Sequence, residues 1–416
     1  MDQQTASEWD NDQQFNEPTI MRKKHSCTPN ELADFLKERG DVYWWPAGGF
    51  FVVTDFQLAK EVMTSKQYSA DRSSFFISRM PNLDLALIKD FFSVVQKMMV
   101  MSDDDEHKNR RRMAALGIND GLVDRYTPII EKTVDKLINK AKQKGYIEFV
   151  DDIAEPLPST VLADIFCIDE KHRKDFYKWS KNMTQFFGGA SKYRNEDGIE
   201  VNESATQMRN YFANLIDNRT REPQDDFISA IIEHKEEFKL DISEVISQAV
   251  MMLVAGQVTT TDQLCNNMYT MMSTPNIFEQ LRENIDLLPT ALEEFNRLDP
   301  GVTFLFRVVR EETFLGKQKV KPGDVIFVAS HVINRDPKIY ERPYECILDR
   351  SKNVHFAYGY GSHFCIGARL AKIQMSFCFH KLITQYPNLR LDPNRLSKRK
   401  HYSLAFSGFD SMHLLF

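Results

Sequence analysis

The chain has 416 residues, of which 42% are hydrophobic and 27% charged, with a formal net charge of -6. This length excludes a small stapled scaffold and indicates either two or three ordinary domains or one large enzyme with a single core. The mean hydropathy is -0.42, and no apolar run approaches the roughly 18 residues that a membrane span needs. The polar N-terminus lacks the pattern of a secretory signal, so we expect a soluble cytoplasmic protein without membrane association.

Cysteines and basic residues are both dispersed along the chain. Without a Cys-x-x-Cys pair or regular spacing, neither a disulfide framework nor a structural zinc site is expected. The spread of Lys and Arg gives no broad basic face, which argues against nucleic acid as a partner. The six cysteines are Cys27, Cys167, Cys265, Cys346, Cys365 and Cys378.

No repeat, low-complexity tract or Gly/Pro/Ser linker divides the sequence. Residues 1–27 are polar and expected to be loosely ordered, which leaves residues 28–416 as one domain. Two β-rich runs, 42–45 and 50–53, flank the turn PAGG and predict a hairpin. Asp55 then precedes the segment FQLAKEVM and is expected to cap a helix there.

From about residue 120 to 300, apolar residues recur at helical spacing. The longest predicted helix begins at Asp241, with Glu244 completing a capping box, and runs to Ser273 across the core. Beyond residue 300 come two β-like runs, VTFLFRVV and VIFVAS, a helix over about 366–385, and a terminal hairpin around Ser407 and Gly408. The predicted fold class is mainly α with small β-sheets.

A glycine-rich stretch, HFAYGYGSHFCIG at residues 355–367, leads directly into the last helix. Gly359 and Gly361 permit a tight turn that presents Cys365 at a helix N-terminus, where the dipole and free N–H groups stabilise a thiolate. A zinc site built on His363 and Cys365 would lack two further ligands. The remaining alternative from the residues alone is a buried structural cysteine.

The stretch resembles the haem-thiolate loop of the cytochrome P450 family, Phe-Gly-x-Gly-x-His-x-Cys-x-Gly, with Tyr358 in place of the usual Phe. The resemblance implies the cytochrome P450 fold, a triangular helical prism with haem b between the long central helix and the Cys-ligand helix. It also implies that Cys365 is the axial ligand of the haem iron, because thiolate donation favours O–O cleavage.

Glu294 and Arg297 lie at i and i+3 on one predicted helix face, which by itself fits a solvated ion pair. The pair also resembles the Glu-x-x-Arg motif of the family, although Asn296 stands where the family prefers an apolar residue. The later run NRDP at 334–337, followed by Pro343 and Arg350, resembles the segment whose arginine completes a buried network with this pair. The implied role is structural.

Four cationic residues match the partners that the family uses for the haem propionates, since buried carboxylates need cations or hydrogen-bond donors. His107 and Arg111 share a helix face at i and i+4, Arg307 lies in an apolar β-like run, and His363 precedes Cys365. Each of them could instead be an ordinary surface charge.

The long helix contains AGQVTT at residues 255–260, which resembles the Ala-Gly-x-x-Thr-Thr motif of the family. Small residues at Ala255 and Gly256 allow a flat cofactor to approach, so both are expected to contact haem. Thr259 is expected beside dioxygen, with a hydroxyl that can bond an i-4 carbonyl and open a local bulge; Thr260 is the second candidate catalytic residue. An ordinary buried helix is the alternative.

Val258 departs from the pattern, because the family usually carries Asp or Glu there for proton delivery. A valine cannot relay protons, so water, Gln257 or polar groups of the substrate take over through Thr259, or turnover is slow, leaky or unusual. This departure keeps a second reading open, in which a haem-thiolate enzyme catalyses a rearrangement, a dehydration or a peroxide-driven oxidation. A non-catalytic haem-binding or sensor protein is the third.

Segments that resemble the substrate-contacting regions of the family are rich in Phe and Met and predict an apolar, adaptable pocket. Each ring could equally belong to the core. The Phe residues in these segments are Phe75, Phe76, Phe186, Phe187, Phe304, Phe306 and Phe406.

No dinucleotide-binding loop is present, so electrons are expected from a separate ferredoxin or flavodoxin with its reductase. Lys108, Arg110, Arg112 and Arg369 are expected to steer an acidic partner to the Cys365 side. We expect a monomer that hydroxylates or epoxidises an apolar or mixed small molecule, free or tethered to a carrier protein, in secondary metabolism.

Overall fold

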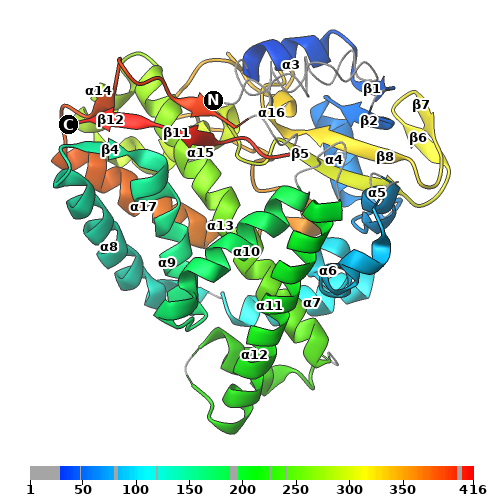
Figure 1. Ribbon diagram of the computed structural model, residues 1–416. Coiled ribbons are helices and arrows are strands. Elements are labelled where there is room, and N and C mark those ends of the chain that lie inside the picture. Colours follow the sequence, from blue (N-terminus) through cyan, green and yellow to red (C-terminus); the bar gives the residue numbers. More distant parts are fainter. Residues whose placement is uncertain are drawn as a thin grey trace.

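Helices dominate the computed structural model, as the apolar periodicity predicts, and small sheets gather on one side of an outline that is roughly triangular (Figure 1). The structure describes residues 29–46, 48–78, 83–118, 120–187, 195–224, 226–238, 241–400 and 405–416. The segment 1–27, which was predicted to be loosely ordered, lies outside the described residues.

The α-helices in chain order are α3 (Pro29–Lys37), α4 (Phe56–Thr64), α5 (Ser73–Ser78), α6 (Lys89–Val95), α7 (Asp104–Leu116), α8 (Asp120–Lys142), α9 (Pro156–Ile165), α10 (Arg173–Phe187), α11 (Asn195–Arg221), α12 (Phe227–His234), α13 (Ile242–Ser273), α14 (Ile277–Glu283), α15 (Leu288–Leu298), α16 (Ser330–Ile333) and α17 (Ala368–Gln385).

The strands are β1 (Val42–Trp45), β2 (Phe50–Val53), β3 (Tyr68–Ser69), β4 (Tyr146–Glu148), β5 (Phe304–Val309), β6 (Thr313–Leu315), β7 (Gln318–Val320), β8 (Val325–Ala329), β9 (Arg390–Leu391), β10 (Lys398–Arg399), β11 (Phe409–Ser411) and β12 (His413–Leu415). The largest sheet has five strands in the order β1-β2-β8-β5-β3, with β2 parallel to β8 and the other pairs antiparallel. The predicted hairpin is therefore confirmed as β1 and β2.

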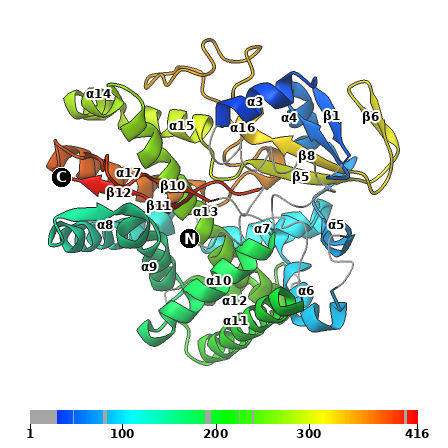
Figure 2. The same cartoon turned by 45° about the horizontal axis from the view of Figure 1, so that its top comes forward.

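Helix α13 is the central element, and the turned view shows α8 to α11 on one side of it and the β5–β8 part of the sheet on the other (Figure 2). The predicted capping box is confirmed, because the Asp241 carboxylate accepts the Glu244 N–H at 2.8 Å and the Glu244 carboxylate accepts the Asp241 N–H at 3.1 Å. The helix continues to Ser273 without interruption. This long rod places residues 255–260 in the middle of the molecule.

The sequence analysis predicts no membrane-spanning segment. This prediction is wrong by length and composition alone, because α13 is long and apolar enough to cross a membrane. Of its most apolar stretch, however, 61% is buried inside the protein. The interior helix of a large core has the same composition as a membrane span, because both are surrounded by apolar groups.

The predicted terminal hairpin is confirmed, because the consecutive strands β10 and β11 pair antiparallel on either side of Ser407 and Gly408, and the Lys400 N–H donates to the Gly408 carbonyl at 3.0 Å. Ser407 donates its N–H to the Gly301 carbonyl at 2.9 Å, and the neighbouring Phe406 forms an isolated bridge with Val302. Strand β11 follows and pairs with β10, whereas β12 pairs with β4 and β9 in another sheet. The hairpin is therefore local, whereas the bridge from Phe406 to Val302 and the pairing of β12 join it to distant parts of the chain.

Candidate functional site

The loop before α17 presents Cys365 through two glycines with positive φ, 72° at Gly359 and 71° at Gly361. A Cβ added to Gly361 would lie 2.9 Å from the Met63 carbonyl oxygen, so only glycine fits there without a shift. The Cys365 N–H donates to the Tyr358 carbonyl at 2.8 Å, which closes the loop. Helix α17 begins three residues after Cys365, as the glycine pattern predicts.

A cavity of about 270 Å³ brings this loop together with the middle of α13. The loop contributes Cys365, and α13 contributes the predicted residues Ala255, Gly256, Thr259 and Thr260. Burial raises the pKa of the Cys365 thiol, while the Gly367 N–H and the charges of Arg111 and Lys372 oppose that rise. Cys365 lines the cavity and is exposed in the structure.

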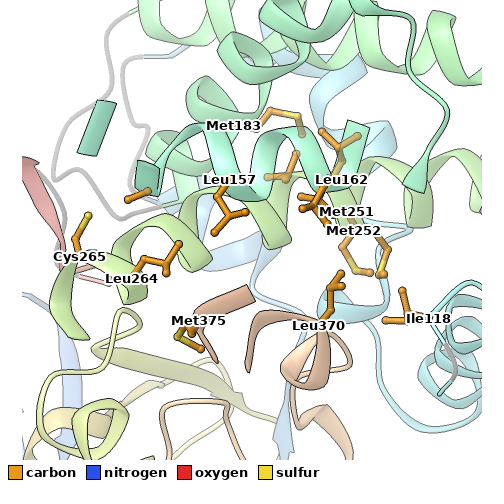
Figure 3. Packing of buried hydrophobic residues seen from close by; sticks show 14 of the residues in the cluster. Ile118, Leu157, Leu162, Met183, Met251, Met252, Leu264, Cys265, Leu370 and Met375 are labelled. Atoms are coloured by element: carbon orange, nitrogen blue, oxygen red, sulfur yellow. The ribbon is translucent and has the colours of Figure 1, made fainter. Parts of the chain in front are cut away.

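Apolar side chains form most of the remaining wall. Figure 3 shows Leu162 of α9 beside Met251 and Met252 of α13, with Leu370 of α17 facing them. Further lining residues are Met99, Val100, Ile118, Ile165, Phe166, Val302, Leu305, Ile366 and Met375. Such a wall excludes water and suits an apolar ligand.

The Thr259 hydroxyl donates to the Ala255 carbonyl, as expected for a threonine in this motif. The predicted local bulge is absent from this stretch, because α13 stays α-helical throughout. Gln257 is buried and donates to the Ser159 hydroxyl at 3.0 Å, so it does not line the cavity as a proton carrier would. Among the described residues that line the cavity, none is Asp or Glu.

The four predicted propionate partners lie together in a neighbouring pocket, which shares His107, Arg111 and His363 with the cavity. His107 and Arg111 project from α7 and Arg307 from β5, and the His107 and His363 rings are 3.9 Å apart between centroids. Burial, reinforced by the charges of Arg307 and the other neighbours, lowers the pKa of His363 to about 2. Burial also lowers the pKa of Arg307 to about 10. The cluster therefore has an excess of positive potential.

Unpaired polar atoms in this cluster test whether haem fits. The His107 Nε2 and Arg307 Nη2 atoms are buried without a hydrogen-bond partner. Leaving such atoms unpaired is costly, and two carboxylates would satisfy them. Arg72 was missed by the sequence reasoning: its Nε is also buried and unpaired, and its charge helps to lower the pKa of His363. A single arginine in the polar stretch SADRSS gives no pattern that predicts this position.

The predicted buried network around Glu294 is confirmed. Its carboxylate accepts from Arg297 Nε at 2.7 Å and Nη2 at 2.8 Å, and from Arg350 Nε at 3.0 Å. Arg297 also donates to the carbonyls of Asn334 at 2.8 Å and Pro343 at 2.7 Å. Because Glu294 and Arg297 are fully buried, the network fixes the chain that leads into the Cys365 loop.

The predicted phenylalanine wall is wrong, because none of the described Phe side chains named for it lines the cavity. Phe304 and Phe306 point away from it and pack with Phe75, Phe76 and Phe327, whereas Leu305 between them lines it. Alternation along β5 explains the error, because neighbouring residues of a strand face opposite sides. The side chains of Phe186 and Phe187 lie outside the described residues, and Phe406 belongs to the bridge with Val302.

The docking patch predicted for an acidic partner consists of Lys108, Arg110, Arg112 and Arg369, and the prediction is wrong for one of these four residues. Arg110 is buried and donates to the Glu244 carboxylate at 2.9 Å, so its charge is neutralised inside the protein and is not available to a docking partner. Lys108, Arg112 and Arg369 are exposed, although Arg112 contacts Glu237 at 3.4 Å and Arg369 contacts Asp124 at 2.5 Å.

Comparison with known proteins agrees with this geometry. A family model described as Cytochrome P450 matches residues 20–401. The biotin biosynthesis cytochrome P450 of Bacillus subtilis is 30% identical over 305 residues, covering 73% of this chain and 76% of that protein. The 6-deoxyerythronolide B hydroxylase of Saccharopolyspora erythraea is 27% identical over 292 residues, covering 70% of each.

A solved structure has the same architecture. CYP109E1 from Bacillus megaterium in complex with testosterone aligns with a TM-score of 0.84 and 26% identity, covering 95% of this chain and 99% of that one. The chain therefore belongs to the cytochrome P450 family, and it is a monooxygenase that binds haem b through a cysteine thiolate.

Proposed function

We propose that Cys365 would ligate the haem iron through its thiolate and that Thr259 of α13 would assist oxygen activation in the same cavity. The observation that carries this assignment is the meeting, in one largely apolar cavity, of a loop-borne thiol and the α13 threonines, with unpaired cations at the edge. The other described cysteines, Cys167, Cys265, Cys346 and Cys378, do not line the cavity.

The surrounding residues then have separate tasks. His107, Arg111, Arg307 and His363 would bind the propionates, which fixes the rotation of the haem in its plane. Ala255 and the backbone of Gly256 leave room for its flat face; a Cβ on Gly256 would instead meet Leu162 at 3.2 Å. The haem supplies oxygen activation when bound, whereas these side chains bind, orient and exclude water.

The reaction that we propose is hydroxylation or epoxidation of an apolar or mixed small molecule in secondary metabolism. One oxygen atom of dioxygen enters the substrate and the other leaves as water, with two electrons and two protons consumed. The Met- and Leu-rich wall supports an apolar substrate, free or tethered to a carrier protein. The relative named a 6-deoxyerythronolide B hydroxylase and the testosterone complex support the same class.

Electrons would come from a separate ferredoxin or flavodoxin with its reductase. The exposed cations Lys108, Arg112 and Arg369 would attract an acidic partner, with Arg110 excluded because it is buried.

The ligand assignment is tested by the absorption spectrum of the reduced, carbon monoxide-bound protein. We expect the thiolate-specific Soret band in the parent and in Cys346→Ser, and its loss in Cys365→Ser. Retention of the band in Cys365→Ser would refute the assignment. A screen for substrate-induced spin shifts in the ferric protein then identifies ligands without requiring the redox partner.

A second candidate function is favoured by the absence of Asp and Glu among the described residues of the cavity wall. Without an acid, a peroxide-driven oxidation or a rearrangement would avoid the need for delivered protons. Product formation that is independent of dioxygen and reductant would establish this alternative, and strict dependence on both would establish the first.

A further inference from the structure

A buried ion pair away from the thiol loop joins α13 to the β10–β11 hairpin. The Lys400 Nζ atom donates to the Asp262 carboxylate at 2.6 Å, and the two side chains are 8% and 1% exposed. The residues are 138 positions apart in the chain. Neither is among the described residues that line the cavity. The pair therefore has a role that direct contact with a ligand does not explain.

The hairpin closes tightly on α13 at this point, and Figures 1 and 2 both show β11 beside the helix. A Cβ added to Gly408 would lie 2.1 Å from the Asp262 carboxylate oxygen, so only glycine permits the approach. The Lys400 N–H donates to the Gly408 carbonyl at 3.0 Å. One helical turn further along α13, the Asn266 amide donates to the Ser407 carbonyl at 3.0 Å. The ion pair is thus the charged part of a close contact between helix and hairpin.

The same hairpin holds one part of the cavity wall. Ser407 donates its N–H to the Gly301 carbonyl at 2.9 Å, and Phe406 forms a bridge with Val302. Gly301 and Val302 both line the cavity. This wall also packs on α13, since a Cβ added to Gly301 would lie 3.5 Å from the Asp262 Cβ. A displacement of the hairpin relative to α13 would therefore move the wall.

The pair is a costly way to stabilise a fold. Burial raises the pKa of Asp262, because an ionised carboxylate loses its hydration there, and the Lys400 charge opposes that rise. The second carboxylate oxygen, Oδ2, is buried without a hydrogen-bond partner in the described part of the chain. Apolar side chains of similar volume would stabilise such a position as well or better. A buried pair differs from them in being directional, because it holds its two partners in a single geometry.

We propose that Asp262 and Lys400 are positioning residues for the substrate, which set the location of the wall at Gly301 and Val302 by fixing the β10–β11 hairpin on α13. A substrate that contacts this wall is then selected by its width, although neither charged group touches it. The inference rests on the proposed haem site only for the ligands that probe the cavity.

The first test measures how tightly two nitrogen ligands of haem iron bind the ferric holoenzyme, from their spectral shifts. Imidazole occupies little of the cavity, whereas 4-phenylimidazole carries an additional ring that must pack against the wall. We expect Lys400→Met and Asp262→Asn each to change the ratio of the two dissociation constants roughly three- to tenfold, within the range for coupled neighbouring residues. Arg219→Met is the matched control, since Arg219 pairs with Asp226 at 2.5 Å in a similarly buried position and neither residue lines the cavity.

The second test does not depend on which residue ligates the iron. Hydrogen exchange of the holoenzyme reports the N–H groups of Thr303 and Ser407, which join the hairpin to the cavity wall. We expect both groups to exchange about threefold faster or more in Lys400→Met than in the parent and in Arg219→Met, because local opening governs exchange.

An unchanged ligand ratio in both Asp262→Asn and Lys400→Met would overturn the proposal, as would equal exchange in Lys400→Met and the parent. A change of the same size in Arg219→Met would also overturn it, because it would show a general loss of stability. If Asp262→Asn fails to fold, the double variant Asp262→Leu/Lys400→Met leaves no buried charge unpaired and serves in its place. If the thiolate Soret band survives in Cys365→Ser, the ligand assignment fails while the exchange test still stands.

Discussion

Replacing Glu294 by Gln would remove the charge at the centre of the buried network while keeping its shape. The carboxylate accepts from Arg297, Arg350, the Ile347 N–H at 3.0 Å and the Asn353 amide at 3.2 Å. In the variant, two buried guanidinium groups lose their counter-ion and the new amide faces donors. Breaking a buried ion pair in this way costs about 3–5 kcal/mol.

The assay is urea unfolding of the holoenzyme, followed by far-UV circular dichroism and Soret absorbance in parallel. Asp217→Asn is the matched control, because Asp217 pairs with Arg221 on an exposed helix face at 2.6 Å and such pairs contribute about 0–1 kcal/mol. A loss in Glu294→Gln no larger than that of Asp217→Asn would refute the reasoning.

The same variant makes a prediction about pH. Burial would raise the pKa of Glu294, but the hydrogen bond and charge of Arg297, with help from Ile347 and Arg350, lower it below the ordinary 4.5. A carboxyl with a lowered pKa stabilises the fold above its unfolded pKa, and this contribution is lost as pH falls through the folded value. The difference between parent and Glu294→Gln should therefore shrink below pH 4.5; a constant difference would contradict the argument.

Three further predictions concern the site. Arg307→Leu should speed haem transfer to apomyoglobin about 10- to 100-fold, since a hydrogen bond to a charged group contributes about 1.5–3 kcal/mol; Lys108→Leu should change it little. Thr259→Ala should uncouple reductant consumption from product formation, whereas Val258→Glu should leave the two coupled. Equal coupling in the parent and in Thr259→Ala would exclude the proposed proton path. Arg369→Glu should slow reduction of the protein by an acidic partner. A rate of electron transfer that does not depend on salt concentration would contradict the docking patch.

Short sequence motifs correctly predict several local features of the fold. The capping box at Asp241, the cap at Asp55 and the glycines before Cys365 specify backbone geometry over a few residues, and each is found where the sequence predicts it. The haem-binding loop is local in the same sense, because its shape depends on positive φ at two glycines.

Other features needed partners that are distant in the chain. The sequence predicts Arg110 to be a surface charge, whereas in the structure it forms an ion pair with Glu244 of α13. Phe304 and Phe306 lie on one face of β5 and Leu305 lies on the other. The pairing of β5 with β8 decides which of these faces turns toward the cavity.

The sequence by itself therefore determined the family, the thiol-bearing loop and the central helix, because those depend on short stretches of residues. Only the tertiary structure decided which side chains line the cavity, and only it joined Asn296 to Tyr358 across 62 positions. Contacts of that kind arise from the packing of whole elements, and residue spacing along one element does not contain them.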